Sequence, residues 1–370
     1  PNQICLLYLR SWDMKSNYDI LGNHIRLIDT RNRESITDRV LGINIDKFFM
    51  PSVANVIGTD LSKYKLITKG KFACNPMHVG RDERLPVALY DEEKPAIVSP
   101  AYFMFEVIDN SILNEDYLMM WFRRPEFDRI CWLHTDGSVR GGITWDDICR
   151  LELPIPPIEN QLEIVNSYKA ITERIALKQK INDNLDDTAQ TLYQKYFESN
   201  SDKSSWKQGT VGDVLQLQRG HDLPRTEMTG GKYPVAGSTG TIGYHDEFTA
   251  EAPVIVMGRS GNIGNPRLYL CNCWTHNTSL YVKQIYEAEP LWVFYLLKNL
   301  NYDGFVGGSA VPTLNRNDVH AYGIAIPPLE LQKSFSQKVM SLIYCKEENL
   351  SEIEKLQELQ KIILTTMSSR

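Results

Sequence analysis

The sequence has no apolar run long enough to cross a bilayer. The apolar stretch Ile4–Leu9 is short, lacks a basic lead-in and ends at Arg10, so it does not predict a signal peptide. The seven cysteines include no C-x-x-C pair, which argues against a zinc ribbon or a disulfide scaffold. These absences predict a protein of the reducing cytoplasm that makes no membrane contact.

Signatures of catalysis are also missing. There is no G-x-x-x-x-G-K-[ST] loop for ATP hydrolysis and no G-x-G-x-x-G loop to hold a methyl donor. The seven histidines show no metal-ligand spacing. The net charge of −6 and the lack of a basic tail argue against an indiscriminate nucleic-acid binder, although a sequence-specific one stays possible. We therefore expect no catalytic site and no metal, and any tight DNA binding should depend on a partner for much of the phosphate contact.

What the sequence does contain is an internal repeat. Residues 155–161 read IPPIENQ, and residues 326–332 read IPPLELQ, 171 positions further on. Before each Pro-Pro step lies an apolar stretch typical of a closing strand, and after it lies a long segment without proline or glycine. Because proline fixes φ and lacks an N–H group, it ends a strand and suits a helix entrance. The unit of strand, Pro-Pro step and long helix therefore occurs twice.

Both expected helices carry apolar residues at spacings of three and four, in the same register, and both turn polar near the middle. A single stripe of this kind is typical of a helix packed on its own domain. Two stripes in register instead favour helices that pair with each other. The residues expected at the pairing surface are Ile171, Leu185, Leu192, Leu342, Ile353, Leu356 and Ile363.

A block rich in short apolar runs and turns precedes each helix, and the two blocks share little sequence between their ends. The sequence thus predicts a mixed α+β fold with two β-rich globular domains, each followed by a long helix. The expected division is a lead at 1–17, a first domain at 18–154, a first helix at 155–198, a linker at 199–205, a second domain at 206–325 and a second helix at 326–370.

The second block has glycine-flanked loops, above all residues 258–264, which read GRSGNIG. Glycine lets the backbone approach a ligand closely, and Arg and Asn side chains can contact base edges through two hydrogen bonds. Plain hairpin turns in a β-rich domain remain an alternative. The DNA-contact candidates here are Arg219, Ser238, Thr239, Arg259, Ser260 and Asn262.

The first block contains Asn75-Pro76, which invites comparison with the Asn-Pro-Pro-aromatic motif of amino-methyltransferases. Met77 and His78 stand in place of the second proline and the aromatic residue, so two of the four residues that define the motif are missing. A loop that contacts DNA, or a structural turn, fits better. The candidates in this block are Lys71, Asn75, His78, Arg81 and Arg140.

The duplicated Pro-Pro-x-Glu-x-Gln step, the in-register helices and residues 233–245 and 258–264 resemble the specificity subunits of type I restriction–modification systems. The resemblance covers almost the whole chain. It implies two target-recognition domains that each read half of a split double-stranded DNA target, and two helices paired antiparallel as a spacer. It also implies partner subunits: two methyltransferase subunits and the ATP-driven restriction subunits. S-adenosylmethionine, ATP and magnesium would be bound by those partners, with no cofactor on this chain.

Two other functions stay open from the residues alone. The chain would be an adenine DNA methyltransferase if its first block bound S-adenosylmethionine. It would be a coiled-coil adaptor if its globular blocks bound proteins.

Overall fold

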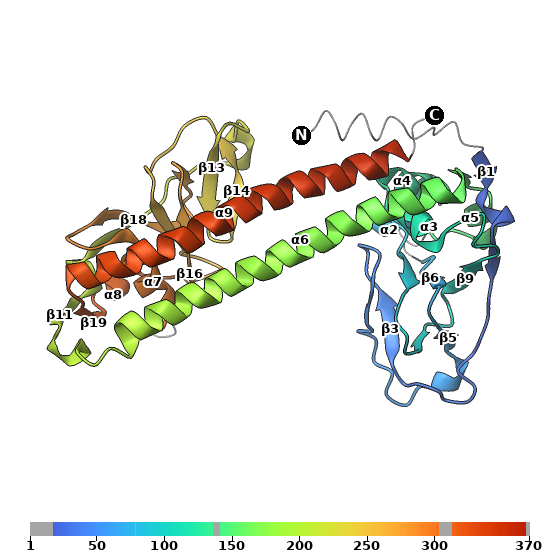
Figure 1. Cartoon of the computed structure of the whole chain (residues 1–370), viewed down its shortest axis with the longest axis horizontal. Coiled ribbons are helices and arrows are strands. Elements are labelled where there is room, and N and C mark those ends of the chain that lie inside the picture. The colour runs from blue at the N-terminus through green and yellow to red at the C-terminus, as the bar shows by residue number, and fades with distance from the viewer. Residues whose placement is uncertain (1–17, 78, 136–140, 303–312, 368–370) are drawn as a thin grey trace. The chain divides into compact units, whose positions relative to one another are not determined.

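The structure is a computed structural model that describes residues 18–77, 79–135, 141–302 and 313–367. The chain forms two compact units. Unit 1 comprises residues 1–177 and 352–370, and unit 2 comprises residues 178–351. Each unit therefore takes one stretch from each of two long helices, α6 (Ile158–Tyr193) and α9 (Leu329–Thr366) (Figure 1).

Unit 1 contains two four-stranded sheets and a two-stranded pair. The main sheet has the order β2-β9-β6-β7, the second sheet has the order β4-β3-β8-β5, and β1 pairs with β10. The strands are β1 (Tyr18–Ile20), β2 (Ile25–Leu27), β3 (Val40–Ile43), β4 (Phe49–Pro51), β5 (Lys65–Ile67), β6 (Lys71–Cys74), β7 (Val87–Tyr90), β8 (Ala96–Val98), β9 (Phe103–Val107) and β10 (Glu152–Pro154). The short helices are α2 (Val79–Asp82), α3 (Glu115–Phe122), α4 (Pro125–Leu133) and α5 (Trp145–Cys149).

Unit 2 contains a four-stranded sheet, a three-stranded sheet and a two-stranded pair. The main sheet has the order β12-β18-β15-β16, the second sheet has the order β14-β13-β17, and β11 pairs with β19. The strands are β11 (Lys207–Thr210), β12 (Leu215–Arg219), β13 (Tyr233–Gly237), β14 (Gly240–His245), β15 (Val254–Gly258), β16 (Gly264–Tyr269), β17 (Trp274–Thr275), β18 (Ser279–Ile285) and β19 (Gly323–Ile326). The short helices are α7 (Pro290–Asn299) and α8 (Arg316–His320).

The two units share one strand topology, which the sequence did not reveal. Both main sheets are wholly antiparallel, and their strands follow the same order along the chain. In both second sheets one strand has an antiparallel and a parallel neighbour: β3 lies between β4 and β8, and β13 lies between β14 and β17. The β6–β7 connection of unit 1 therefore corresponds to the β15–β16 connection of unit 2.

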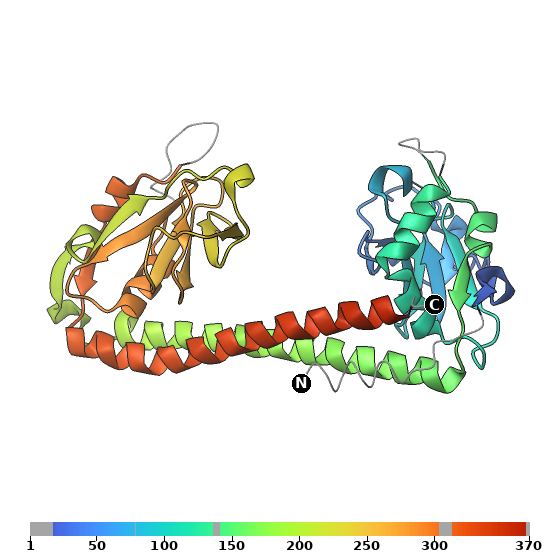
Figure 2. The same ribbon diagram turned by 90° about the horizontal axis from the view of Figure 1, so that it is seen from above.

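Both long helices contribute to the core of each unit. In unit 1, Ile164 of α6 and Ile363 of α9 are buried in the same cluster as the strand residues Phe72 and Phe105. In unit 2, Tyr193 of α6 and Phe335 of α9 are buried with Trp292 and Leu280. Burying one such side chain contributes about 1.5–3 kcal/mol, so each unit depends on both helices. Figure 2 shows, for each unit taken by itself, that the strands lie on one side of the helices.

The helices pair antiparallel within each unit. In unit 1, Thr172 meets Gln360 at 2.7 Å, and Arg174 meets Glu352 at 2.7 Å. In unit 2, Lys178 donates to Asn349 at 2.8 Å, and Tyr196 lies 3.5 Å from Ser334. As the residue number rises along α6 it falls along α9. The predicted fold class is confirmed: two β-rich domains, each followed by a long helix, with the helices in an antiparallel coiled coil.

The residues expected at the pairing surface are buried to different degrees. Ile353 and Ile363 are buried, Ile171 packs against the core of unit 1, and Leu192 and Leu342 pack against the core of unit 2. The other two expected residues, Leu185 and Leu356, are partly buried.

The polar middle of the stripe is a hydrogen-bonded layer. Asn349 donates to Asn182 at 2.9 Å and accepts from Lys178, and both asparagines are buried.

No helix in the described part of the chain is both long and apolar enough to span a membrane.

Candidate nucleic-acid interface

In unit 2, loops from four parts of the sequence meet in one place. Asn262 donates its side-chain amide to the Ser238 carbonyl oxygen at 3.2 Å. The Ser238 amide donates to the Thr278 hydroxyl at 3.3 Å, and the Arg259 amide donates to the Thr278 carbonyl oxygen at 3.0 Å. Arg219, at the end of β12, donates to the carbonyl oxygen of the residue before Thr278 at 3.4 Å. We call Arg219, Ser238, Arg259, Asn262 and Thr278 the loop cluster.

The β15–β16 turn needs its glycines. A Cβ atom on Gly258 would lie 1.5 Å from the Asn262 carbonyl oxygen, a distance that no side chain tolerates. Gly261 and Gly264 have φ angles of 78° and 72°, in the left-handed region that glycine adopts without strain. The glycine spacing noted in the sequence is therefore what allows the turn to close on itself.

The loop cluster is cationic and has hydrogen-bonding capacity left over. Among the described residues, the Arg259 guanidinium has no hydrogen-bond or ion-pair partner, and the side chain is partly exposed. Arg219 lies 4.0 Å from Asp222, at the outer limit of an ion pair. Thr239 is exposed, and Ser260 pairs with Thr313 in an isolated β-bridge. Free guanidinium and hydroxyl groups suit contacts to base edges and phosphates.

Two residues differ from what the sequence suggested. The Asn262 amide is engaged at both ends, because Nδ2 donates to Ser238 and Oδ1 accepts from Asn265 at 2.7 Å. Its clearest role in the structure is to hold the turn. Arg267 of β16, not among the candidates, is exposed, and a Cβ atom on Gly240 at the start of β14 would lie 2.9 Å from its guanidinium. The only sequence signal for Arg267 is its position in β16, where side chains alternate between the two faces of the strand.

In unit 1 the predicted cations already have partners. Lys71 pairs with Glu106, which also binds Arg26 at 2.6 Å. Arg81 binds Asp82 through two hydrogen bonds of 2.6 and 2.9 Å. His78 and Arg140 lie outside the described residues.

The Asn75-Pro76 step of unit 1 forms a turn that packs on residues 142–143. The Asn75 side chain accepts from the Met77 amide at 3.1 Å. The Ile143 amide donates to the Pro76 carbonyl oxygen at 3.2 Å, so the structure brings the segment around residue 76 and the glycine-rich segment at 141–143 together.

The last residue of each repeated Pro-Pro step fastens the domain to its helix. Gln161 is fully buried; it donates to the carbonyl oxygens of Ile112 and Pro156, both at 2.8 Å, and accepts from the Asn114 amide at 2.9 Å. Gln332 is buried in the same way; it donates to a proline carbonyl oxygen at 2.9 Å and accepts from the Glu289 amide at 2.9 Å. Asn114 and Glu289 are the N-caps of α3 and α7.

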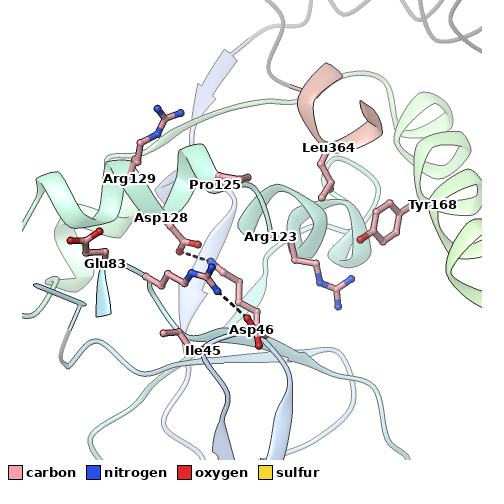
Figure 3. A pocket seen from close by; sticks show the side chains of 11 residues that line it. Ile45, Asp46, Glu83, Arg123, Pro125, Asp128, Arg129, Tyr168 and Leu364 are labelled. Atoms are coloured by element: carbon pink, nitrogen blue, oxygen red, sulfur yellow. Dashed lines mark hydrogen bonds and ion pairs between the residues drawn. The ribbon is translucent and has the colours of Figure 1, made fainter. Parts of the chain in front are cut away.

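A cavity of about 410 Å³ in unit 1 lies between the β3–β4 turn, α4 and the two long helices (Figure 3). Lys47 pairs with Asp128 at 2.7 Å, and Arg84 pairs with Asp46 at 2.9 Å. Burial lowers the pKa of the Lys47 ammonium, and the Asp128 carboxylate opposes that shift. The Lys47–Asp128 pair holds the turn against α4, and the Arg84–Asp46 pair holds it against the segment that follows α2. Within the ranges that the structure describes, no three His, Cys, Asp or Glu side chains are grouped as metal ligands would be.

Comparison with known proteins gives the context for these two units. Residues 203–362 match the family described as the Type I restriction modification DNA specificity domain. The protein named as the specificity subunit of the MjaX type I restriction enzyme in Methanocaldococcus jannaschii is 22% identical over an alignment of 397 positions, which covers 95% of this chain and 88% of that protein.

Two solved structures share the fold. One is the S subunit of the type I restriction–modification system of M. genitalium, with a TM-score of 0.61, 15% identity, and coverage of 97% of this chain and 98% of that chain. The other comes from work on complex assembly and conformational transition of the type I restriction–modification system, with a TM-score of 0.50, 16% identity, and coverage of 95% and 97%. At such low identity these likenesses show the fold alone. By the match over residues 203–362 and by the relative that spans almost the whole chain, this chain is similar to type I restriction–modification specificity subunits.

Proposed function

We propose that this chain selects the DNA target of a type I restriction–modification complex, and that each unit reads one half of a bipartite sequence. The observation that carries the proposal is the duplication: two domains of one topology are fastened by equivalent glutamines, Gln161 and Gln332, to one pair of helices. The proposed recognition domains are residues 18–154 and 206–325. Residues 155–198 and 326–370 are the proposed spacers, after a lead at 1–17 and around a linker at 199–205.

The helices set the spacing between the half-sites in this proposal. α6 has 36 residues and rises about 54 Å at ~1.5 Å per residue, against about 34 Å for one turn of DNA. Removing one heptad from both helices should shorten the gap in the recognised sequence. A recognition site with an unchanged gap after that deletion would refute the spacer role.

Methylation and cleavage belong to partner subunits in this proposal. Two methyltransferase subunits dock on the exposed faces of the paired helices, and restriction subunits join them. S-adenosylmethionine, ATP and magnesium are bound by those partners, and this chain is not an enzyme. An S-adenosylmethionine binding assay on the purified chain separates this proposal from a methyltransferase, because the proposal expects no binding.

The decisive experiment maps methylated adenines in cells that carry this chain and its partners. The expected result is one split motif with a fixed gap. Arg259→Ala should reduce the discrimination between bases in one half of that motif by about fivefold or more, since a good side-chain contact to a base discriminates by about 1–3 kcal/mol. Arg225→Ala is the matched control, because Arg225 is an exposed arginine of unit 2 outside the loop cluster. Equal weakening on all sequences would show that Arg259 contacts phosphates.

Protection assays address the remaining alternative, a protein-binding adaptor. The chain with its partners should protect a defined duplex from exonuclease. Complexes that assemble fully but protect no duplex would instead support the adaptor.

A further inference from the structure

The strand topology assigns a counterpart of the loop cluster in unit 1. The Ile143 amide donates to the Pro76 carbonyl oxygen, and the Leu314 amide donates to the Arg259 carbonyl oxygen. Ile143 and Leu314 are 171 positions apart, the spacing of the sequence repeat. Pro76 and Arg259 also stand just after equivalent strands, β6 and β15. The turn at residues 75–77 is therefore the structural equivalent of residues 258–260.

The two equivalent turns differ in chemistry. In unit 2 the turn carries the Arg259 guanidinium, which has no partner among the residues that the structure describes. In unit 1 the cations near the turn are neutralised, Lys71 by Glu106 and Arg81 by Asp82. The unit 1 turn thus offers no described cation of its own to a base edge.

Met77 is the side chain that the unit 1 turn does present. It is 50% exposed. The backbone amide of Met77 donates to the Asn75 side chain. Residues 142–143 pack against the turn so closely that a Cβ atom on Gly142 would be 3.0 Å from the Pro76 carbonyl oxygen. An exposed, unbranched thioether on a fixed backbone suits an apolar partner. The apolar feature that a base pair shows in the major groove is the thymine methyl group.

We infer that Met77 reads a thymine methyl group in the half-site bound by unit 1. The inference rests on the proposed function and deepens it, because it names the chemistry by which the second half-site is read. Unit 2 then selects bases through Arg259, whereas unit 1 selects at least one base by apolar contact.

The test measures binding of the complex, assembled with its methyltransferase partners, to its own target and to targets with uracil in place of each thymine. Uracil lacks only the methyl group. For the unchanged protein, one such replacement should weaken binding about fourfold, the ratio expected for one methyl-sized apolar contact. The sensitive thymine should lie in the half-site that Arg259→Ala leaves unaffected.

Three variants make the assignment specific. Met77→Ala should bind the thymine and uracil targets equally, whereas Met77→Leu should keep most of the discrimination. Val53→Ala removes another exposed aliphatic side chain of unit 1, 92% exposed, and should behave as the unchanged protein. Thermal melting of each variant checks that the fold is intact.

Two outcomes overturn the inference: a half-site for unit 1 without thymine on either strand, or a uracil effect that persists in Met77→Ala. Both leave the proposed function standing. Failure of the unchanged complex to prefer any split sequence would instead refute the proposed function.

Discussion

Replacing Gln161 with alanine tests whether the repeated Pro-Pro step fastens a recognition domain to its helix. The Gln161 amide satisfies the Ile112 and Pro156 carbonyl oxygens and the Asn114 amide, and its side chain is fully buried. Alanine leaves all three backbone groups without that partner.

The size of the effect follows from the count of hydrogen bonds. A buried hydrogen bond contributes about 1 kcal/mol, and a buried group left unsatisfied costs about 1–3 kcal/mol. Gln161→Ala should therefore destabilise unit 1 by about 3 kcal/mol. Gln332→Ala breaks two such bonds and should destabilise unit 2 by about 2 kcal/mol. Glu159→Ala, an exposed change two residues from Gln161, should stay within about 0.5 kcal/mol.

Amide hydrogen exchange measures these effects unit by unit, which a single melting curve of a two-unit chain does not. In Gln161→Ala, exchange at Asn114 should accelerate by about two orders of magnitude while exchange at Glu289 stays unchanged. The reverse pattern is expected for Gln332→Ala. If Gln161→Ala exchanged like Glu159→Ala at Asn114, the glutamine would not be the fastener that its contacts indicate.

The remaining predictions concern the helix seam, a histidine and a glycine. Asn182→Leu and Asn349→Leu should each lower the melting temperature, and the double variant should lose less than the sum of the two, with a coupling of at least ~0.5 kcal/mol in a double-mutant cycle; strictly additive losses would contradict a direct interaction. His320 accepts the Leu217 amide at 2.8 Å, and burial and then Arg316 lower its pKa, so the folded form binds a proton less readily than the unfolded chain. The contribution of His320 to the stability of unit 2 should therefore be fully present above pH ~6.5 and decline as the pH falls below it. His320→Gln should flatten that dependence in urea titrations. A variant with the same pH profile as the unchanged protein would exclude His320 as its source. Gly258→Ala should abolish sequence-selective binding in a gel-shift assay while leaving amide exchange at Asn114 of unit 1 unchanged.

The repeat predicts the frame of the molecule well because its spacing is rigid. Between Ile143 and Gln161 the first copy matches the second at a constant offset: Ile143 corresponds to Leu314, and Gln161 to Gln332. One inserted residue would turn the helix face by about 100° and remove it from the core. The shared sheet order was not predictable, because its strands are three to seven residues long and their equivalents differ in sequence.

The sequence predicts the candidate site where neighbouring residues determine the backbone. It does not predict it where a side chain forms an ion pair with a residue far away in the sequence. The glycines around Arg259 force a tight turn, so its exposure follows from the sequence alone. Lys71, by contrast, is neutralised by Glu106 on β9, 35 positions away, and no local pattern reveals that pairing. Arg81 is neutralised by its own neighbour Asp82, a contact that depends on the short helix α2.

Chain length is more tightly constrained just before each long helix than in the connections between the main-sheet strands, and this difference has a physical origin. The stretch that leads into the helix is fixed by buried contacts at both ends, so the two copies keep one length there. The connections between the main-sheet strands close loops whose entropy changes by only about 0.6 kcal/mol when their length doubles. Insertions there, such as the additional strand β5 of unit 1, cost little as long as the strand order is kept. A turn such as the one that bears Arg259 or Met77 can therefore change its chemistry without disturbing Gln161 or Gln332. Exchanging residues 258–262 of unit 2 for another sequence with the same glycines should alter the recognised bases while the helix pairing and both glutamine contacts stay as they are.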